Sequence, residues 1–464
     1  MSSNIDALNV TEVIDRARLS RLQLWVICVC TLIIVLDGFD VQAIAFAGPA
    51  IAAEWQMATS ALGPILGAGL VGMAVGALLL GPLGDVFGRK AAITVSVLTF
   101  GSMSLVTAWA SNESQIMLLR FLTGLGLGGA MPNATALMAE YAPARLRNLT
   151  ISIIFLGFPL GGIVGGLIAA EIIPVWGWRS VFIVGGVLPI VLATLILWRM
   201  PESIRFLVAK KTAQTKQIDQ IMKRIEPKLE HDNNIRYSLG EASAQTKKLL
   251  VKHLFDRGYK LDTVLLWIVF FVNLLEIYFL ISWLPALMVE SNFDISQATR
   301  TVVVLNVGGA IGALVLAWLI ARNGSRSMLL LFFVAGAIST ILIGQVAVPA
   351  DSTAVNPGIS LALIMSATFF AGFFIFGAQI GMNVLAASMY PTYVRSTGVG
   401  WALGIGRLGS ILGPVIGGIL LGLGLGMGFY FLAFGLILLV AAGASFALSR
   451  HQAPVDRTLA SPVQ

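Results

Sequence analysis

Apolar stretches of about 20 residues, the length that crosses a bilayer as a helix, recur along the whole chain. Short polar segments separate them, and one longer polar segment follows the sixth stretch. The pattern predicts an all-α polytopic membrane protein with twelve transmembrane helices in two pseudo-symmetric bundles of six. The predicted spans are 23–48, 60–81, 91–110, 115–140, 148–171, 179–200, 262–289, 297–320, 327–348, 358–388, 397–422 and 426–449.

The longer polar segment, 201–261, holds 13 Lys or Arg against 7 Asp or Glu. Within it, Ile218 to Ile225 shows helical apolar spacing, which predicts short amphipathic helices lying at the membrane surface. The expected organisation is a tail at 1–22, a bundle at 23–200, a central loop at 201–261, a second bundle at 262–449 and a tail at 450–464.

Charge in the short loops predicts the orientation. Loops on the side of 201–261 are basic, with Arg89, Lys90, Arg145, Arg147, Arg322, Arg326 and Arg395, whereas the opposite loops carry Glu54, Glu113, Glu290, Asp294 and Asp351. Because basic loops stay in the cytoplasm, we expect both termini and the central loop there. The first apolar run is long enough to remain as an anchor, so no removable signal peptide is expected.

Composition supports this class. Of the 464 residues, 57% are hydrophobic and only 11% are charged, which no soluble globule of this size resembles. The net charge of +7 is explained by the loops and the central segment better than by nucleic acid. The two cysteines, Cys28 and Cys30, form no disulfide framework or metal site. No nucleotide loop or nucleophile with a base is evident, so we expect neither an enzyme nor a cofactor.

Two acids inside the first span, Asp37 and Asp40, are the main functional signal. A carboxylate at bilayer depth costs roughly 2.5–3.5 kcal/mol, so a pair one turn apart needs a compensating reason. Their i, i+3 spacing puts both on one face, and Gly38 leaves room for a helix or solute. We interpret them as a proton-coupling site; the alternative is a structural pair locked to partners on a facing helix.

Two arginines lie inside other spans. Arg120 falls at a depth similar to that of Asp40, which favours an ion pair between them, with Asp37 as the less compensated acid that takes the proton. Arg407 comes near the midplane of the eleventh span and can grip a carboxylate through two hydrogen bonds. The alternative for Arg407 is an ion pair with Glu276, and the two could alternate between conformations.

A cavity for an aromatic solute needs polar groups for ring hydroxyls and flat apolar walls. Each aromatic could instead face lipid or pack between helices. Glu140, at the end of the fourth span, could pass protons or hold Arg147. The candidates are Asn133, Asn273, Tyr278, Trp283, Gln379 and Asn383 as polar groups, with Phe39, Phe155, Phe158, Phe376 and Trp401 as walls.

The two halves echo each other, as in transporters built from repeats. Residues 72–80 (GMAVGALLL) resemble 308–316 (GGAIGALVL), and 141–147 (YAPARLR) resemble 390–395 (YPTYVR). Between the second and third spans, 81–90 (GPLGDVFGRK) resembles the signature loop of the major facilitator superfamily. This resemblance implies a gating role for Gly81, Asp85 and Arg89, and we extend it to Arg147 and Arg395. The equivalent loop of the second half has Ala321 at the acidic position, so the first latch should matter more.

Further motifs resemble the aromatic acid:proton symporter family over nearly the whole chain: 37–40 (DGFD), 124–133 (GLGLGGAMPN), 282–285 (SWLP), 395–398 (RSTG) and 406–409 (GRLG). The resemblance implies uptake of a small aromatic carboxylate with protons, through a cavity between two bundles. We further expect a monomer in the bacterial inner membrane. The alternatives are a proton-driven exporter of a drug or metabolite, and a membrane sensor that binds the acid without moving it.

Overall fold

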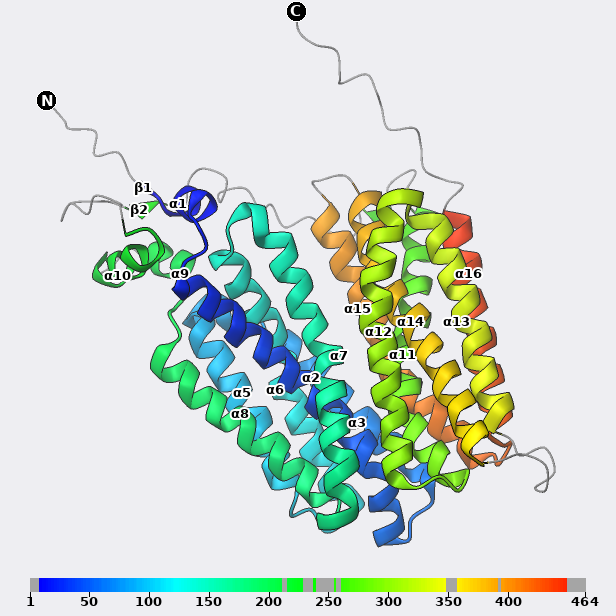
Figure 1. Ribbon diagram of the computed structural model, residues 1–464. Coiled ribbons are helices and arrows are strands. Elements are labelled where there is room, and N and C mark those ends of the chain that lie inside the picture. The colour runs from blue at the N-terminus through cyan, green and yellow to red at the C-terminus, as the bar shows by residue number, and fades with distance from the viewer. Residues whose placement is uncertain are drawn as a thin grey trace, which may run out of the picture. The chain divides into compact units, whose positions relative to one another are not determined.

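The structure is a computed structural model that describes residues 8–210, 215–227, 237–238, 254–255, 260–347, 357–390 and 394–448. These residues are almost entirely helical (Figure 1). Two short strands, β1 (Leu8–Asn9) and β2 (Tyr237–Ser238), pair in parallel.

Each predicted span coincides with a long helix within the described residues. The first six are α2 (Arg21–Trp55), α3 (Leu62–Leu79), α5 (Arg89–Thr107), α6 (Glu113–Tyr141), α7 (Ala144–Trp176) and α8 (Arg179–Arg199). The other six are α11 (Lys260–Glu290), α12 (Ile295–Asn323), α13 (Ser325–Ala347), α14 (Pro357–Met389), α15 (Arg395–Gly422) and α16 (Met427–Leu448). In this part of the chain, eleven helices are long and apolar enough to cross a membrane. α6 falls short because Arg120 and Asn133 lower its mean hydropathy.

The first long helix extends seven residues beyond its predicted end, because α2 passes through Pro49 and stops at Trp55. Its last turn is held from α8. Trp178 Nε1 and Arg179 Nη1 donate to Oε2 of Glu54 at 2.8 and 2.9 Å, and Trp55 packs edge to face on Trp178. The extension places the two acids near the middle of the helix.

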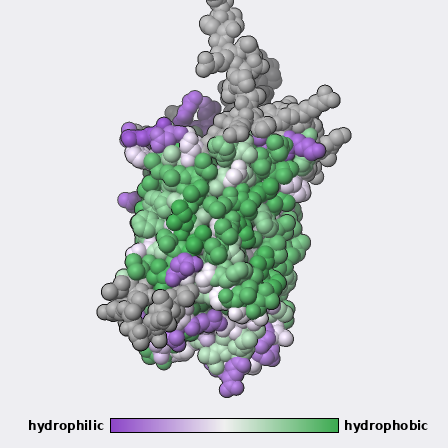
Figure 2. All heavy atoms as spheres, turned by 90° about the vertical axis from the view of Figure 1, so that its right-hand side faces the viewer, coloured by the Kyte–Doolittle hydropathy of each residue, from purple (hydrophilic) through white to green (hydrophobic). Residues whose placement is uncertain are grey.

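The chain forms two compact units. The first unit comprises 1–247, 281–306 and 414–422, and the second comprises 248–280, 307–413 and 423–464. Three helices are therefore divided between the units: α11 after Leu280, α12 after Asn306 and α15 after Gly413. On the face shown in Figure 2, a broad apolar surface is bordered by hydrophilic residues at both ends, as expected for a protein surrounded by lipid.

The central segment contains α9 (Ile204–Ala209) and α10 (Thr215–Ile225). The predicted helix around 218–225 is present, but it does not offer its apolar side to the membrane. Its residues Ile218, Ile221, Met222 and Ile225 are buried, and α10 contacts α2 and α9. Two other short helices, α1 (Val10–Arg16) and α4 (Leu83–Phe87), lie near the ends of α7 and α5.

Glycines bring the backbones of helices together in both units, as the echoed segments predict. In the first unit, a Cβ added to Gly72 or Gly76 would lie 2.0–2.1 Å from carbonyl oxygens of α6. In the second unit, a Cβ added to Gly308 or Gly312 would lie equally close to carbonyl oxygens of α14, at 2.1 and 1.9 Å. The same residue pattern thus makes the same kind of helix contact twice.

Gly38, between the two acids, allows α7 to approach α2. We expect Gly38→Ala to destabilise the protein by about 1–3 kcal/mol or more, because its Cβ would lie 2.2 Å from the carbonyl oxygen of Phe158. Thermal unfolding of the purified protein would measure this. The matched control is Gly443→Ala in α16, where the added Cβ meets nothing within 4 Å. An equal melting temperature for both variants would contradict this account of the helix contact.

Candidate functional site

Asp40 is fully buried and paired with Arg120, as their matching depths predict. Nη2 of Arg120 lies 2.9 Å from Oδ2 of Asp40 and also 2.9 Å from its backbone oxygen. Ser104 donates its hydroxyl proton to Oδ1 of the same carboxylate at 2.5 Å. The Arg120 guanidinium also lies 5.7 Å from the ring centre of Phe182. Arg120 of α6 therefore neutralises the Asp40 charge on α2, and Ser104 of α5 helps to hold the carboxylate.

Asp37 is also fully buried, one turn before Asp40 on α2. Its neighbour Phe39, an expected cavity wall, is packed instead between helices, because its ring occupies the spaces left by Gly165 of α7 and Gly185 of α8. The prediction that Phe39 lines a solute pathway does not fit this position. Phe39, which lies between the two acids in the sequence, thus fills the space that the glycines of α7 and α8 leave open.

A polar residue that the sequence did not single out lies on the same helix. Gln42 is fully buried, donates to the backbone oxygen of Gly38 at 3.2 Å and accepts from Asn306 Nδ2 at 2.8 Å. Within the described residues, Oδ1 of Asn306 has no hydrogen-bond partner. Gln42 lies five residues after Asp37 and two after Asp40, and in the sequence only this spacing could have indicated it.

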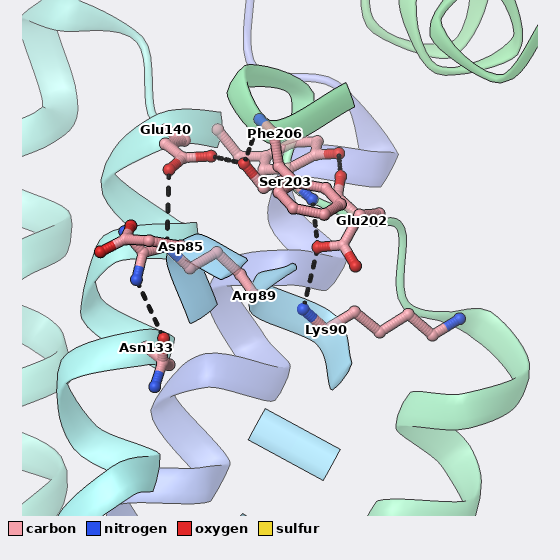
Figure 3. A network of polar contacts seen from close by, with 9 residues as sticks. Asp85, Arg89, Lys90, Asn133, Glu140, Glu202, Ser203 and Phe206 are labelled. Carbon is pink, nitrogen blue, oxygen red and sulfur yellow. Dashed lines mark hydrogen bonds and ion pairs between the residues drawn. The ribbon is translucent and has the colours of Figure 1, made fainter. Parts of the chain in front are cut away.

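Asp85 and Arg89, two of the residues predicted to form a gate, lie in a cluster of polar side chains that we call the latch cluster: Asp85, Arg89, Asn133, Glu140, Glu202 and Ser203 (Figure 3). Arg89 stands at its centre. Its Nη2 lies 2.5 Å from Oδ1 of Asp85, its Nη1 donates to Oδ1 of Asn133 at 3.0 Å, and its Nε lies 4.0 Å from Glu140. Asp85 thus pairs inside its own loop, and its side chain is 70% exposed.

Glu202 and Ser203 complete the latch cluster, although the sequence assigned them no role. Oε1 of Glu202 accepts from the backbone nitrogen of Lys90 at 3.0 Å, at the start of α5, where a negative charge is favoured. Ser203 caps α9 and donates its hydroxyl proton to Glu140. A serine three residues before Phe206, at the start of an apolar turn, is the capping signal that could have indicated this position.

Two expected roles change in this cluster. Asn133, predicted to bind substrate, uses its amide to hold Leu80 and Gly129 through their oxygens and accepts from Arg89, so it positions the latch cluster. Glu140 contacts Ser203 and Arg89, not Arg147. Arg147 pairs with Asp15 of α1 at 2.5 Å.

The two echoed loops have matching contacts in their own units. Arg147 donates to Ala139 and Ala142, and Arg395 donates to Tyr390, so each arginine binds carbonyl oxygens at the end of the preceding helix. The buried tyrosines at these helix ends also correspond. The hydroxyl of Tyr141 donates to the backbone oxygen of Glu202 at 2.7 Å, and that of Tyr390 donates to Oγ1 of Thr263 at 3.1 Å. Burial raises the pKa of Tyr390.

The second unit contains a buried polar cluster on α11, α13 and α14. Thr340 donates to Oε1 of Glu276 at 3.1 Å, and Nδ2 of Asn273 donates to Oε1 of Gln379 at 2.9 Å. Within the described residues, three acceptor atoms here have no partner: Oε2 of Glu276, Oδ1 of Asn273 and Oδ1 of Asn383. These atoms can accept hydrogen bonds from ring hydroxyls.

Arg407 lies on α15, which packs closely on α11. The neighbouring Gly406 faces Phe270 and Leu274, and a Cβ at Gly409 would lie 2.1 Å from the oxygen of Phe271. These contacts place Arg407 at the level of Asn273. Its side chain is half-buried, and the alternative ion pair with Glu276 is not formed in the described structure.

The remaining aromatic candidates divide by exposure. Trp283 is fully buried and donates Nε1 to the oxygen of Pro414 at 2.9 Å, so it packs helices together and does not line a cavity. Trp401, stacked on Trp267, and Phe155 are each 42% exposed. Phe158 and Phe376 are half-buried and remain candidates for the walls, and Tyr278, also half-buried, remains a candidate polar group.

The Major Facilitator Superfamily sequence model matches residues 30–392 and 266–462. The chain is 39% identical to the 4-hydroxybenzoate transporter PcaK of Acinetobacter baylyi over 443 residues, which cover 95% of this chain and 94% of that protein. The chain belongs to the major facilitator superfamily. Within the superfamily it is also 37% identical to a gallate transporter of Pseudomonas putida over 444 residues, with 96% of each chain covered.

The solved structures support the same fold for this major facilitator protein. A bacterial homologue of the human lysosomal transporter Spinster superimposes with a TM-score of 0.71 at 17% identity, over 94% of this chain and 98% of the other. The facilitator fold accounts for the twelve long helices and the echoed glycine contacts. The family model and the relatives named as transporters identify the protein as a transporter and not an enzyme.

Proposed function

We propose that this protein imports a small aromatic carboxylate together with protons, by exposing one binding region alternately to the two sides of the membrane. Aromatic acid transport is the coarser part of the proposal, and its support comes from relatives named as 4-hydroxybenzoate and gallate transporters. The observation that carries the proton-coupled part is a fully buried pair of acids in the middle of a membrane-crossing helix.

The two acids have different roles in this proposal. Asp40 is committed to Arg120 and Ser104, which keep its charge stable, and we assign it to tuning the site. Asp37 lies one turn away on the same helix and binds and releases the proton. Burial favours the neutral form of a carboxylic acid, so the proton is held until water or a cation reaches it.

Arg407 holds the substrate carboxylate in this proposal. Arg120 is the weaker candidate, because its exposure is 2% and Asp40 already occupies its Nη2. Arg407 is half-buried, and its guanidinium takes part in no ion pair that the described residues form. Oδ1 of Asn273 and Oδ1 of Asn383, which have no partner among the described residues, suit the ring hydroxyl of a hydroxybenzoate. Benzoate, phenoxyacetates and related acids carry the same carboxylate group for Arg407.

The latch cluster is proposed as the gate at its end of the first unit. Arg89 joins α4, α5 and α6 through Asp85, Asn133 and Glu140, so release of these contacts would free the loop between α3 and α5. The basic loops support an orientation in which this end faces the cytoplasm, and we propose the inner membrane of a bacterial cell as the location. Protons are the only coupling ion proposed.

Uptake into proteoliposomes tests the function. We expect labelled 4-hydroxybenzoate to accumulate when the outside is made acidic, and a proton ionophore to abolish the accumulation. Counterflow of labelled substrate without a gradient would separate transport from binding. Loss of substrate from loaded vesicles under the same inward proton gradient would favour the exporter, and binding without counterflow would favour a sensor.

Arg407→Gln should weaken binding of labelled 4-hydroxybenzoate by about 10- to 100-fold, because a charge-assisted hydrogen bond of this kind contributes about 1.5–3 kcal/mol. Equilibrium binding to the purified protein would measure it. The matched control is Arg322→Gln, which removes an arginine that stacks on Trp318 at the end of α12. Unchanged affinity in Arg407→Gln would assign the carboxylate to another residue.

A further inference from the structure

A cavity of about 530 Å³ lies in the first unit, beside the latch cluster. It is bounded by the start of α2, the loop before α5, the last residue of α8, the segment 200–210 and α10. Its volume falls within the roughly 300–1,000 Å³ that small-molecule sites typically have. None of the residues assigned to proton or substrate binding lines it.

The wall of this cavity is basic. Lys90, Arg199, Lys210 and Arg224 line it, against the single acid Glu202. The Glu202 carboxylate accepts from the backbone nitrogens of Lys90 and Ser203, and its single charge is outnumbered by these cations. Among the described residues, neither Arg199 nor Arg224 forms an ion pair. Such a surplus of positive charge is complementary to an anion.

The surface around the cavity belongs to the edge of the bilayer. Arg199 follows Trp198, which is 75% exposed at the end of the membrane-crossing helix α8. Val86 and Phe87, at the end of α4, are also exposed. Tryptophan and exposed apolar side chains next to cations are typical of the interface between hydrocarbon and headgroups. A ligand in the cavity would therefore lie at the level of lipid phosphates.

We propose that this cavity binds the phosphate of an anionic phospholipid headgroup from the adjacent leaflet. Arg199 and Arg224 approach the phosphate from α8 and α10, with Lys90 as the third cation. Apolar residues of the same wall, Leu22 and Met200, suit the glycerol and the first methylenes of the chains. Basic pockets at the ends of membrane helices bind anionic headgroups by this combination of charge and apolar contact.

The site shares Glu202 with the latch cluster, and Lys90 of the site donates its backbone nitrogen to that carboxylate. A bound lipid would therefore contact the proposed gate from outside the solute pathway. The binding inference does not depend on the proposed function, because it rests on the cavity, its charge and its place at the bilayer edge. It can therefore be tested without transport.

The experiment uses the full chain in nanodiscs of equal parts phosphatidylglycerol and phosphatidylcholine, followed by native mass spectrometry of the lipids it retains. We expect preferential retention of phosphatidylglycerol. Removing charge with Arg199→Gln and Arg224→Gln should weaken that preference by about fivefold for each cation. The control, Lys216→Gln with Lys223→Gln, removes the same charge from exposed positions of α10 outside the cavity.

Three results would overturn the proposal. One is equal retention of the two lipids by the unmodified protein. Another is an equal loss of preference in the control, which would assign binding to the general charge of α10. The third concerns the source of the phosphate: if inorganic phosphate or glycerol phosphate displaces the lipid at equal concentration, the cavity binds a soluble anion. Circular dichroism of each variant would establish that it is folded.

Discussion

Asp37→Asn is expected to abolish accumulation of the aromatic acid while exchange of substrate across the membrane continues. The asparagine amide has a similar size but cannot bind and release a proton, so a pH gradient no longer drives uptake. A pH difference of one unit is worth about tenfold accumulation for each coupled proton. Proteoliposomes with an acidic exterior measure the first effect, and counterflow measures the second.

The control for this prediction is Glu290→Gln, which removes an exposed acid at the end of α11. It should leave accumulation unchanged. Full pH-dependent uptake by Asp37→Asn would remove Asp37 from the mechanism. Loss of both accumulation and counterflow would instead show that the acid is needed to build the site.

Asp40→Asn is expected to lower the stability of the protein by about 3–5 kcal/mol, because it leaves Arg120 buried without a counter-charge. Thermal unfolding of the purified protein would report the loss. Arg120→Gln should have an effect of similar size, since it strands the Asp40 carboxylate. The double variant should lose less than the sum of the two, because no unpaired charge then remains.

Transport by the double variant separates a functional pair from a structural one. A pair that only joins α2 and α6 would permit transport once stability is restored. We expect the double variant to fold and still fail to accumulate substrate, because Arg120 and Asp40 tune the neighbouring acid. Accumulation near the unmodified level would reduce the pair to a helix contact.

The sequence predicted the helices well because the bilayer imposes length and apolarity on every span. It also predicted the partner of Asp40, since a charge buried in lipid needs an opposite charge at the same depth and Arg120 satisfied that condition. The repeated loops could be matched because Tyr141 with Arg147 and Tyr390 with Arg395 keep the same chemistry.

The contacts of single aromatic and amide residues could not be predicted. A helix such as α2 is apolar on all sides, so periodicity does not separate the side that meets lipid from the side that meets helices. Phe39 and Trp283 were therefore placed in a cavity although they pack between helices. Asn133 was misplaced for a related reason, because its hydrogen bonds run to Leu80 and Arg89, distant in the sequence.

The ends of elements depended on contacts that no local pattern contains. α2 continues past Pro49 because Trp178 and Arg179, far along the chain, bind its last turn. The sequence of α10 is typical of a helix that lies on the membrane surface, but its apolar side is buried against other parts of the protein.

The glycine contact between α2 and α7 works in both directions, because a Cβ at Gly161 would lie 2.0 Å from the oxygen of Val35, just as one at Gly38 would meet Phe158. Two helices packed this closely cannot slide or rotate against each other without steric clashes. Asp37, the proposed proton carrier, would therefore move together with α2 and α7, and water from the two sides could reach it in turn only if this helix pair tilts as one body.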